Sequence, residues 1–338
     1  MDPITQGVLG AALPQAIATS RKGAVALAGI FGFIAGMAAD LDVFIRSTED
    51  PLLFLEYHRQ FTHSLLFIPL GGLISATILH VLIGRRLRLT FARTLLICTL
   101  GYGTHGMLDL ATSYGTMLFW PFSHERFAAS IISIVDPLLT VPIVLLVILA
   151  GIRRSPLCGR LALTWVCLYL TVAAVQHEAA RRMAEDIATT RGHSIERLTV
   201  KPTFGNILVW RSVYESKGRF FVDGLRVGIA PTMYTGLSIA RLDPARDFPW
   251  LDPASQQYRD LMRFDRFSQG YVSHNPDEPN AVIDVRFSFL PHKIGALWSI
   301  VLKPDAPPEQ HALYQTNRRD ARTNMAMLWR LITADRKP

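Results

Sequence analysis

The chain has 338 residues, of which 50% are hydrophobic and 18% charged, and its formal net charge is +8. Residues 1–178 hold 22 charged residues in and between long apolar runs, whereas residues 179–338 hold 40. This contrast predicts a membrane-embedded domain followed by a soluble domain large enough for its own core. Three cysteines without a C-x-x-C spacing argue against a disulfide framework or a thiolate metal site. Excess Lys and Arg in such a chain indicate membrane topology, so no nucleic-acid partner is expected.

Five apolar runs come near the length of about 20 residues that a helical membrane span requires. They are Gly23–Ala39, Ser64–Ile83, Thr94–Ala111, Ile131–Ile152 and Leu161–Val175. The stretch Ile4–Thr19 is also uncharged but contains Pro14, so it forms either a sixth, short span or a half-helix. The predicted fold is therefore mainly α, a polytopic helical bundle of five to six spans.

Basic residues alternate between the two sides of these spans. The turns containing Arg21-Lys22, Arg85–Arg93 and Arg153–Arg160 hold nine basic residues and no acidic ones, whereas segments 43–62 and 112–130 hold three basic residues. By the positive-inside rule the first set lies in the cytoplasm. The last span then exits on the outer side, which predicts an extracytoplasmic soluble domain.

Histidines and aspartates gather at the outer ends of the predicted spans. Ionisable side chains are costly at membrane depth, so such a cluster favours a functional site, although capping of helix ends near the headgroups is the competing interpretation. His105 and Asp109 are four residues apart and share a helix face. Asp40 and Asp42 either bind a metal directly or orient a histidine that binds it. Mixed imidazole and carboxylate ligation suits zinc, manganese or iron. The residues of this cluster that could bind a metal are Asp40, Asp42, His58, His63, His105 and Asp109.

Other polar residues on this side have two interpretations each. Arg59 and Arg126 either hold an anionic group of the substrate or contact lipid headgroups. Together with Asp42, they are the predicted catalytic residues. His124 either covers the site or lies in a solvated loop, and Asp136 either binds metal or caps the next helix.

The short motifs, taken in order, resemble those of the YdjM family. They are Met-Asp-Pro-Ile-Thr at the start, Ala-Asp-Leu-Asp42, His58-Arg-Gln-Phe-Thr-His-Ser64, His105-Gly-Met-Leu-Asp109 and Tyr114–Ser123, within residues 1 to about 150. The resemblance implies a bacterial or archaeal inner-membrane protein, a metal-dependent hydrolase activity and the six ligand positions above. More remotely, the pattern is similar to zinc-dependent phospholipase C and P1-type nucleases, which implies phosphoester hydrolysis.

One position departs from the family pattern. Family members usually carry Thr-His near the N-terminus, whereas this chain has Thr5-Gln6. An amide is a poor zinc ligand, so the resemblance implies that Gln6 weakens one metal position.

Residues 179–338 are predicted to form an α+β domain with a small sheet. The last span continues as a helix to about Thr190. No ligand constellation stands out in this part, which favours a packing and recognition role. Strands are expected at Asn206–Tyr214, Phe220–Ile229, Ala281–Leu290 and Leu297–Leu302, and helices at Gln256–Phe264 and Pro308–Thr333.

These features predict a metal-dependent hydrolase, with zinc as the expected cation, in the bacterial inner membrane. Its substrate would be a phosphorylated or lipid-linked molecule at the outer face, bound beside the lipid bilayer. One alternative is a non-catalytic membrane scaffold or regulator with a structural metal, which Gln6 favours. Another is an ion transporter, but the predicted ligands lie at one face and not at mid-membrane, where transporter sites usually lie.

Overall fold

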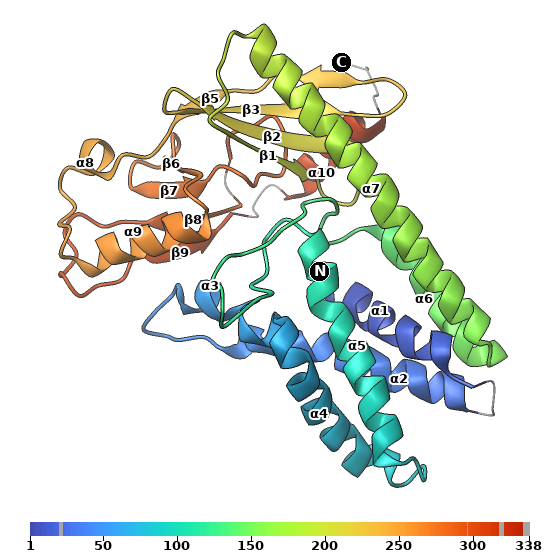
Figure 1. Ribbon diagram of the computed structural model, residues 1–338. Coiled ribbons are helices and arrows are strands. Elements are labelled where there is room, and N and C mark those ends of the chain that lie inside the picture. Colours follow the sequence, from blue (N-terminus) through green and yellow to red (C-terminus); the bar gives the residue numbers. More distant parts are fainter. Residues whose placement is uncertain (20–22, 296, 318–320, 334–338) are drawn as a thin grey trace. The chain divides into compact units, whose positions relative to one another are not determined.

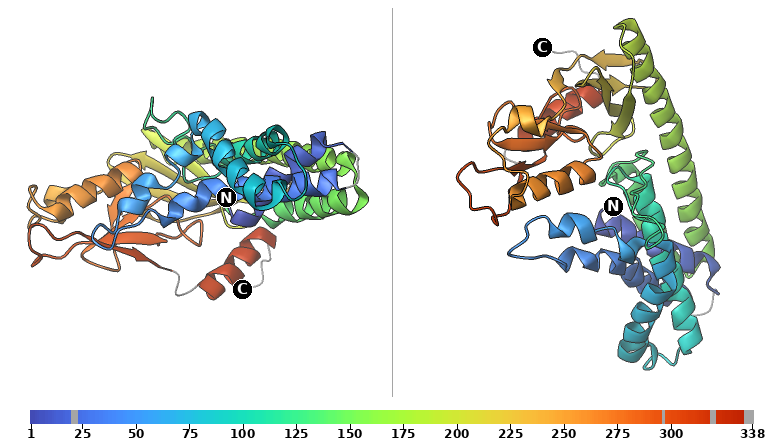
Figure 2. Two further views of the ribbon diagram at one scale, coloured as in Figure 1. Left: turned by 90° about the horizontal axis from the view of Figure 1, so that it is seen from below. Right: turned by 60° about the vertical axis from the view of Figure 1, so that its left-hand side comes forward.

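The computed structural model describes residues 1–19, 23–295, 297–317 and 321–333 (Figures 1 and 2). The turn at Arg21-Lys22 therefore lies outside the described residues. The chain divides into two compact units. The helical unit comprises Met1–Phe44, Tyr57–Ala174 and Phe204–Asn206, and the C-terminal unit comprises Ile45–Glu56, Val175–Thr203 and Ile207–Pro338.

The helices of the first unit follow the predicted apolar runs. They are α1 (Pro3–Ile17), α2 (Ala24–Met37), α4 (Ile68–Leu79), α5 (Phe91–Ala111), α6 (Pro137–Arg153) and the first part of α7 (Pro156–Thr190). Three 3₁₀ turns lie between them, at Ala38–Phe44, Phe61–His63 and Leu65–Phe67, and a π-helical turn at His80–Gly84 extends α4. The expected continuation of the last span to Thr190 is confirmed.

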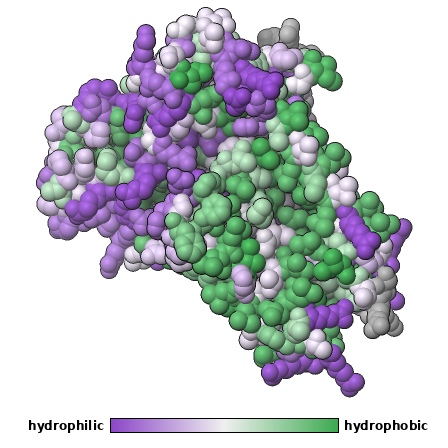
Figure 3. All heavy atoms as spheres, viewed as in Figure 1, coloured by the Kyte–Doolittle hydropathy of each residue, from purple (hydrophilic) through white to green (hydrophobic). Residues whose placement is uncertain are grey.

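Among the described residues, three helical stretches are long and apolar enough to cross a membrane: Ala24–Phe44, Leu65–Gly84 and Pro156–Thr190. Helix α6 is also apolar but has only 17 residues. Large apolar side chains remain exposed on these helices, and hydrophobic residues cover much of this unit's visible face (Figure 3). A surface of this kind is stable when lipid covers it. The total of five to six spans stays a prediction.

Helices α1, α2 and α5 approach one another at glycines. A Cβ atom built on Gly101 of α5 would lie 2.6 Å from the carbonyl oxygen of Gly32 on α2. One built on Gly32 would lie 2.3 Å from the carbonyl oxygen of Gly10 on α1. Only glycine permits backbones to come this close, as in other helices packed within membranes. This contact lies one helical turn before His105.

The C-terminal unit contains two antiparallel sheets. The first consists of β1 (Arg197–Pro202), β2 (Val209–Ser216), β3 (Arg219–Arg226) and β4 (Thr232–Tyr234) in that order, with β5 (Ser238–Ala240) also paired to β3. The second has the order β6 (Val272–His274), β7 (Ala281–Asp284), β8 (Trp298–Val301) and β9 (Leu313–Thr316). The described helices of this unit are α3 (Leu53–Tyr57) up to Glu56, the part of α7 from Val175 on, α8 (Pro244–Asp247), α9 (Gln256–Phe267) and α10 (Ala321–Thr333).

A buried apolar cluster joins the two sheets. It consists of Val213, Phe220, Val222, Tyr271, Ile283 and Val285. The register of β2 and β3 brings Ser216 opposite Arg219, so Lys217 and Gly218 form the two-residue turn, both with positive φ as such hairpins require.

The predicted strands are confirmed in β2, β3, β7 and β8, and the first predicted helix in α9. The predicted helix Pro308–Thr333 is wrong in its first half. Leu313–Thr316 form β9, which pairs with β8, and Ala321–Thr333 form α10. Hydrogen bonding to a neighbouring strand here outweighs the local helical periodicity, which carries no information about strand partners.

The glycine contact predicts different outcomes for two neighbouring substitutions on α5. Gly101→Ala should destabilise the helical unit by about 1–3 kcal/mol, because its Cβ meets backbone atoms that cannot move aside. Gly103→Ala is the matched control, since its Cβ would lie 3.4 Å from the Ile68 side chain, an ordinary contact. Thermal unfolding of the detergent-solubilised variants measures the difference, and equal melting temperatures would contradict the close packing.

Candidate metal centre

Four of the six predicted ligands meet in the helical unit. Asp40 lies on the 3₁₀ turn that ends α2, His63 on the turn before α4, and His105 and Asp109 on α5. Each offers one ligand atom, and all four atoms lie within 4.8 Å of one another. The side chains of His63, His105 and Asp109 are fully buried, whereas that of Asp40 is 22% exposed. The cluster therefore reaches the surface through Asp40.

The separations of these atoms match those of ligands around one small cation. The Asp40 Oδ1 atom lies 3.4 Å from His63 Nε2 and 3.3 Å from His105 Nε2. The Asp109 Oδ2 atom lies 3.2 Å and 3.6 Å from the same two nitrogens. Tetrahedral bonds of about 2.0–2.1 Å, as zinc forms with nitrogen and oxygen, place neighbouring ligand atoms about 3.3 Å apart.

The same atoms lack hydrogen bonds. Among the described residues, His63 Nε2, His105 Nε2 and Asp109 Oδ2 are buried and have no hydrogen-bond partner. Buried polar atoms without a partner are costly and rare in native structures. Here three such atoms converge on one point, and a cation bound at that point would interact with all of them.

Both histidines are oriented so that Nε2 faces the cluster. His105 Nδ1 lies 2.6 Å from the carbonyl oxygen of Gly36 and so donates its proton to it. His63 Nδ1 lies 3.2 Å from Asp42 Oδ2 and 2.9 Å from Thr62 Oγ1. Protonation at Nδ1 leaves the Nε2 lone pairs free, as in carboxylate–histidine–zinc sites.

The electrostatics of the cluster favour a positive charge. Burial alone would lower the pKa of His63, but the carboxylates of Asp109, Asp40 and Asp42 outweigh it and raise the pKa to about 10. A proton on His63 therefore compensates the carboxylates in the absence of another cation. A bound metal would do the same and release that proton.

Asp42 lies behind the cluster and links two histidines. Its Oδ1 lies 2.7 Å from His58 Nδ1, and its Oδ2 accepts from Thr62 Oγ1 and the Arg59 backbone N–H. Asp40, Asp42 and His58 form a second group with metal-ligand spacing. The 2.7 Å separation is a hydrogen bond and is shorter than the roughly 3.3 Å between two ligands of one zinc ion. This spacing favours Asp42 and His58 as an orienting pair beside the four atoms, and their role as metal ligands stays a prediction.

Asp109 is held by its other oxygen. Its Oδ1 accepts from Gln6 Nε2 at 3.0 Å, pairs with Arg59 Nη2 at 3.1 Å and accepts from the amino group of Met1. These donors leave Oδ2 for the cluster. The Gln6 amide thus contacts Asp109 through its nitrogen, while its Oε1 is buried and has no hydrogen-bond partner among the described residues.

The two predicted catalytic arginines contact the protein itself. Arg59 is buried, has a φ of 63° and also donates to Thr112 Oγ1 at 2.9 Å. Its left-handed backbone is uncommon for a residue with a side chain and marks local strain. Arg126 donates from both terminal nitrogens to the His58 carbonyl oxygen at 3.1 Å. Arg59 thus holds Asp109, and Arg126 holds the backbone at His58.

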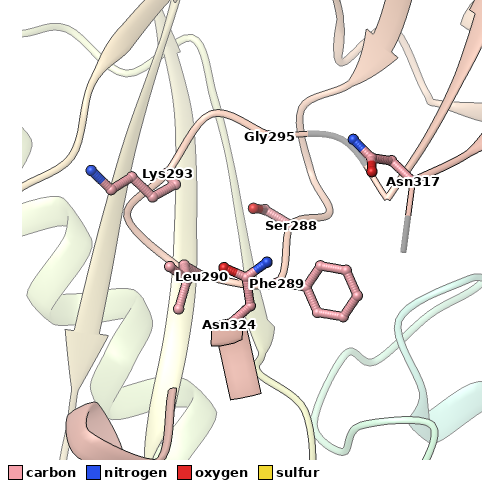
Figure 4. Close-up of a pocket in the computed structure, with 7 residues that line it drawn as sticks. All are labelled: Ser288, Phe289, Leu290, Lys293, Gly295, Asn317 and Asn324. Carbon is pink, nitrogen blue, oxygen red and sulfur yellow. The ribbon is translucent and has the colours of Figure 1, made fainter. Parts of the chain in front are cut away.

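Other candidates lie apart from the four ligand atoms. Asp136 caps α6 through the Leu139 N–H and accepts from Tyr169 Oη at 2.7 Å, in agreement with its capping interpretation. His124 is an exposed loop residue. In the C-terminal unit, a cavity of about 180 Å³ (Figure 4) is lined by Ser288, Phe289, Leu290, Lys293, Gly295, Asn317 and Asn324. Those described lining residues carry no carboxylate or imidazole.

Sequence reasoning missed the residues that support the ligands through hydrogen bonds. Thr62 contacts both Asp42 and His63, and Tyr102 donates to the Thr62 carbonyl oxygen at 2.7 Å. The position of Thr62 beside His63 is a weak signal for its role. The Gly36 contact is made by a backbone carbonyl, which no residue type reveals.

Comparisons with known proteins address the helical unit. The family model described as YdjM inner membrane protein matches residues 1–180, and this range contains all six predicted ligands. No curated protein and no solved structure matches the chain. Because the family model covers more than half of the chain, this membrane protein belongs to the YdjM inner membrane protein family.

Proposed function

We propose that this protein is a metal-dependent hydrolase of the membrane that acts on a phosphoester or a lipid-linked substrate at the outer face. The observation that carries the proposal is the convergence of three buried atoms without hydrogen bonds, His63 Nε2, His105 Nε2 and Asp109 Oδ2, with the carboxylate of Asp40. Zinc suits this donor set and spacing best. When bound, a divalent cation supplies Lewis acidity, which activates water and polarises a phosphoryl group.

The chain's own residues would orient the reactants. Asp42 holds His63 toward the cluster and His58 beside it. The His58 side chain is 34% exposed, so its free ring edge can reach a substrate as well as solvent. Arg126 fixes the backbone there, and in our proposal it also neutralises an anionic substrate group when that group approaches.

A lipid substrate is supported by the surroundings of Asp40. Residues three apart on a 3₁₀ helix share a face, so Leu41 and Phe44 lie together on the turn Ala38–Phe44. They are 62% and 78% exposed. An exposed apolar pair next to a partly exposed ligand suits a substrate with a polar headgroup and a hydrocarbon chain.

A structural metal is the second candidate, and one observation favours it. Structural zinc sites are closed by four protein ligands, whereas catalytic sites keep one position open. Here four protein ligands are available. A catalytic role therefore requires that Asp40, the candidate ligand nearest the surface, leaves its coordination position so that water or substrate can occupy it.

Removal of one ligand tests the metal centre. His105→Ala should remove most of the bound zinc, because it deletes one of the two imidazoles among the four candidate ligands. Zinc per protein, measured by mass spectrometry after purification in detergent, reports the loss. His124→Ala, on an exposed loop, is the control and should keep wild-type metal content. Equal zinc in wild type and His105→Ala would refute the centre.

Hydrolysis assays separate the catalytic from the structural role. Zinc-loaded protein should hydrolyse a phospholipid in mixed micelles, and the double variant Leu41→Ser/Phe44→Ser should lower kcat/KM for that lipid by about 10-fold or more, since two apolar contacts are lost. The rate with the soluble ester bis(p-nitrophenyl) phosphate should change little. A protein that retains zinc but hydrolyses neither ester supports the structural candidate instead.

The outer placement is tested by thiol labelling in intact cells. In a Cys167→Ser background, which removes the exposed native cysteine, Ser123→Cys should react with a membrane-impermeant maleimide. Arg88→Cys, in a turn assigned to the cytoplasm, should react only after the cells are opened. The reverse pattern would place the metal centre at the inner face.

A further inference from the structure

The segment that joins two residues of the metal centre belongs to the C-terminal unit. The chain leaves the helical unit after Phe44, two residues past Asp42, and re-enters it at Tyr57, one residue before His58. Between these points, Ile45–Glu56 packs with the C-terminal unit. Asp42 and His58 form a hydrogen-bonded pair, and the chain segment between them packs with the C-terminal unit.

Arg263 on α9 is the main polar partner of this segment. Its Nη1 and Nη2 donate to the two carboxylate oxygens of Asp50 at 3.0 Å and 2.8 Å, and its Nε donates to Glu56 Oε1 at 2.7 Å. One guanidinium thus holds the middle and the end of the segment. A two-pronged arginine–carboxylate pair fixes direction as well as distance.

The other side of Arg263 is fixed by a buried carboxylate. Asp260, one turn earlier on α9, is fully buried and accepts from Arg263 Nη1 at 3.0 Å, from Gln256 Nε2 at 3.0 Å and from the Ala312 N–H at 2.9 Å. His311 Nδ1 lies 2.9 Å from the same carboxylate. The guanidinium is therefore held in position by the C-terminal unit.

Apolar contacts accompany the ion pairs. Leu52 is buried, and the ring of Phe54 meets that of Tyr314 edge to face at a centroid distance of 5.0 Å. Tyr314 lies on β9. The segment is thus anchored to α9 by charge and to the second sheet by an aromatic contact.

This cluster is better explained by Arg263 than by a second metal ion. Asp50, Asp260 and His311 have ligand atoms at metal-ligand spacing. However, the guanidinium already donates to both carboxylates and supplies a positive charge between them. Burial would raise the pKa of Asp50, but the hydrogen bonds from Arg263 hold it below its ordinary value. The carboxylates are therefore compensated by the protein.

We propose that Arg263 is a positioning residue for the metal centre: by holding Asp50 and Glu56, it fixes the connection between Asp42 and His58 and thereby raises the affinity of the centre for a divalent cation. This inference rests on the metal centre of the proposed function. Asp42 orients the ligand His63, and loss of such outer partners typically lowers metal affinity about 10- to 100-fold. If the segment 45–56 were mobile, each binding of a metal ion would have to order it, and this loss of entropy would lower the affinity.

Three variants of the full-length protein in detergent test this role. Arg263→Gln should release the segment and weaken zinc binding about 10-fold, measured by competition with a chromophoric chelator. Arg263→Lys should restore part of the affinity, because an ammonium can hold one carboxylate but not two at once. Arg246→Gln is the matched control, since Arg246 makes a similar two-pronged pair with Asp247 on α8 and should keep wild-type affinity.

Trypsin provides a readout of the segment itself. Arg46 lies within it and is exposed, so cleavage after Arg46 should be faster in Arg263→Gln than in wild type and Arg246→Gln. If Arg263→Gln does not fold, Asp50→Asn removes the same pair from the other side.

The outcomes separate this inference from the proposed function. A wild-type protein that binds no zinc overturns the metal centre itself. A wild-type protein that binds zinc, together with unchanged affinity in Arg263→Gln, overturns the positioning role alone. Equal losses in Arg263→Gln and Arg246→Gln would mean general destabilisation and would also overturn it, as would unchanged cleavage after Arg46.

Discussion

A carboxylate buried among apolar helices needs a positive charge or hydrogen-bond donors close to it. Much of the helical unit provides such partners for Asp40, Asp42 and Asp109. Asp109 is fully buried and has donors on one oxygen only. Its other oxygen faces two imidazole nitrogens that lack hydrogen bonds. Arg59 and the Met1 amino group offset the charge of Asp109 on the side of Oδ1, and a proton or a metal ion among the four atoms would offset it on the side of Oδ2. The geometry and the charge of the cluster therefore favour a bound cation.

The scaffold around the cluster keeps the candidate ligands in place without using the atoms that face one another. Glycines bring α2 and α5 together, so the backbone carbonyl of Gly36 can hold His105. Asp42 plays the same part for His63 through its carboxylate. Each imidazole is thus held through Nδ1 and presents Nε2. One ring nitrogen is therefore used for orientation and the other is left for a metal ion, as is usual for histidines in metal sites.

Access distinguishes the two candidate roles of the centre. Three ligands are closed off from solvent, and only Asp40 is partly exposed. Leu41 and Phe44 flank that opening with exposed apolar side chains. Any substrate would therefore arrive next to Asp40, on the side where His58 also has an exposed ring. A purely structural metal would not need the exposed imidazole.

Much of this protein follows from its sequence because the signals are local. Apolar runs predicted the helices, since helix formation and membrane burial depend on residues near in the chain. The spacing of His105 and Asp109 predicted two ligands on one helix face. The helix predicted at Pro308–Thr333 failed in its first half because β9 depends on a partner strand, which periodicity does not reveal. Gln6 departs from the family pattern, but the sequence does not indicate its hydrogen bond to Asp109, because the two residues are far apart in the chain.

Residue types alone therefore determined a membrane protein with a set of six candidate ligands, and tertiary structure assigned their places. Four ligand atoms lie at coordination spacing, whereas Asp42 and His58 lie at hydrogen-bond distance. These spacings differ by about half an ångström, and this difference distinguishes the candidate ligands from the candidate orienting residues. It arises from how helices far apart in the chain pack against one another, and no local sequence pattern encodes that packing.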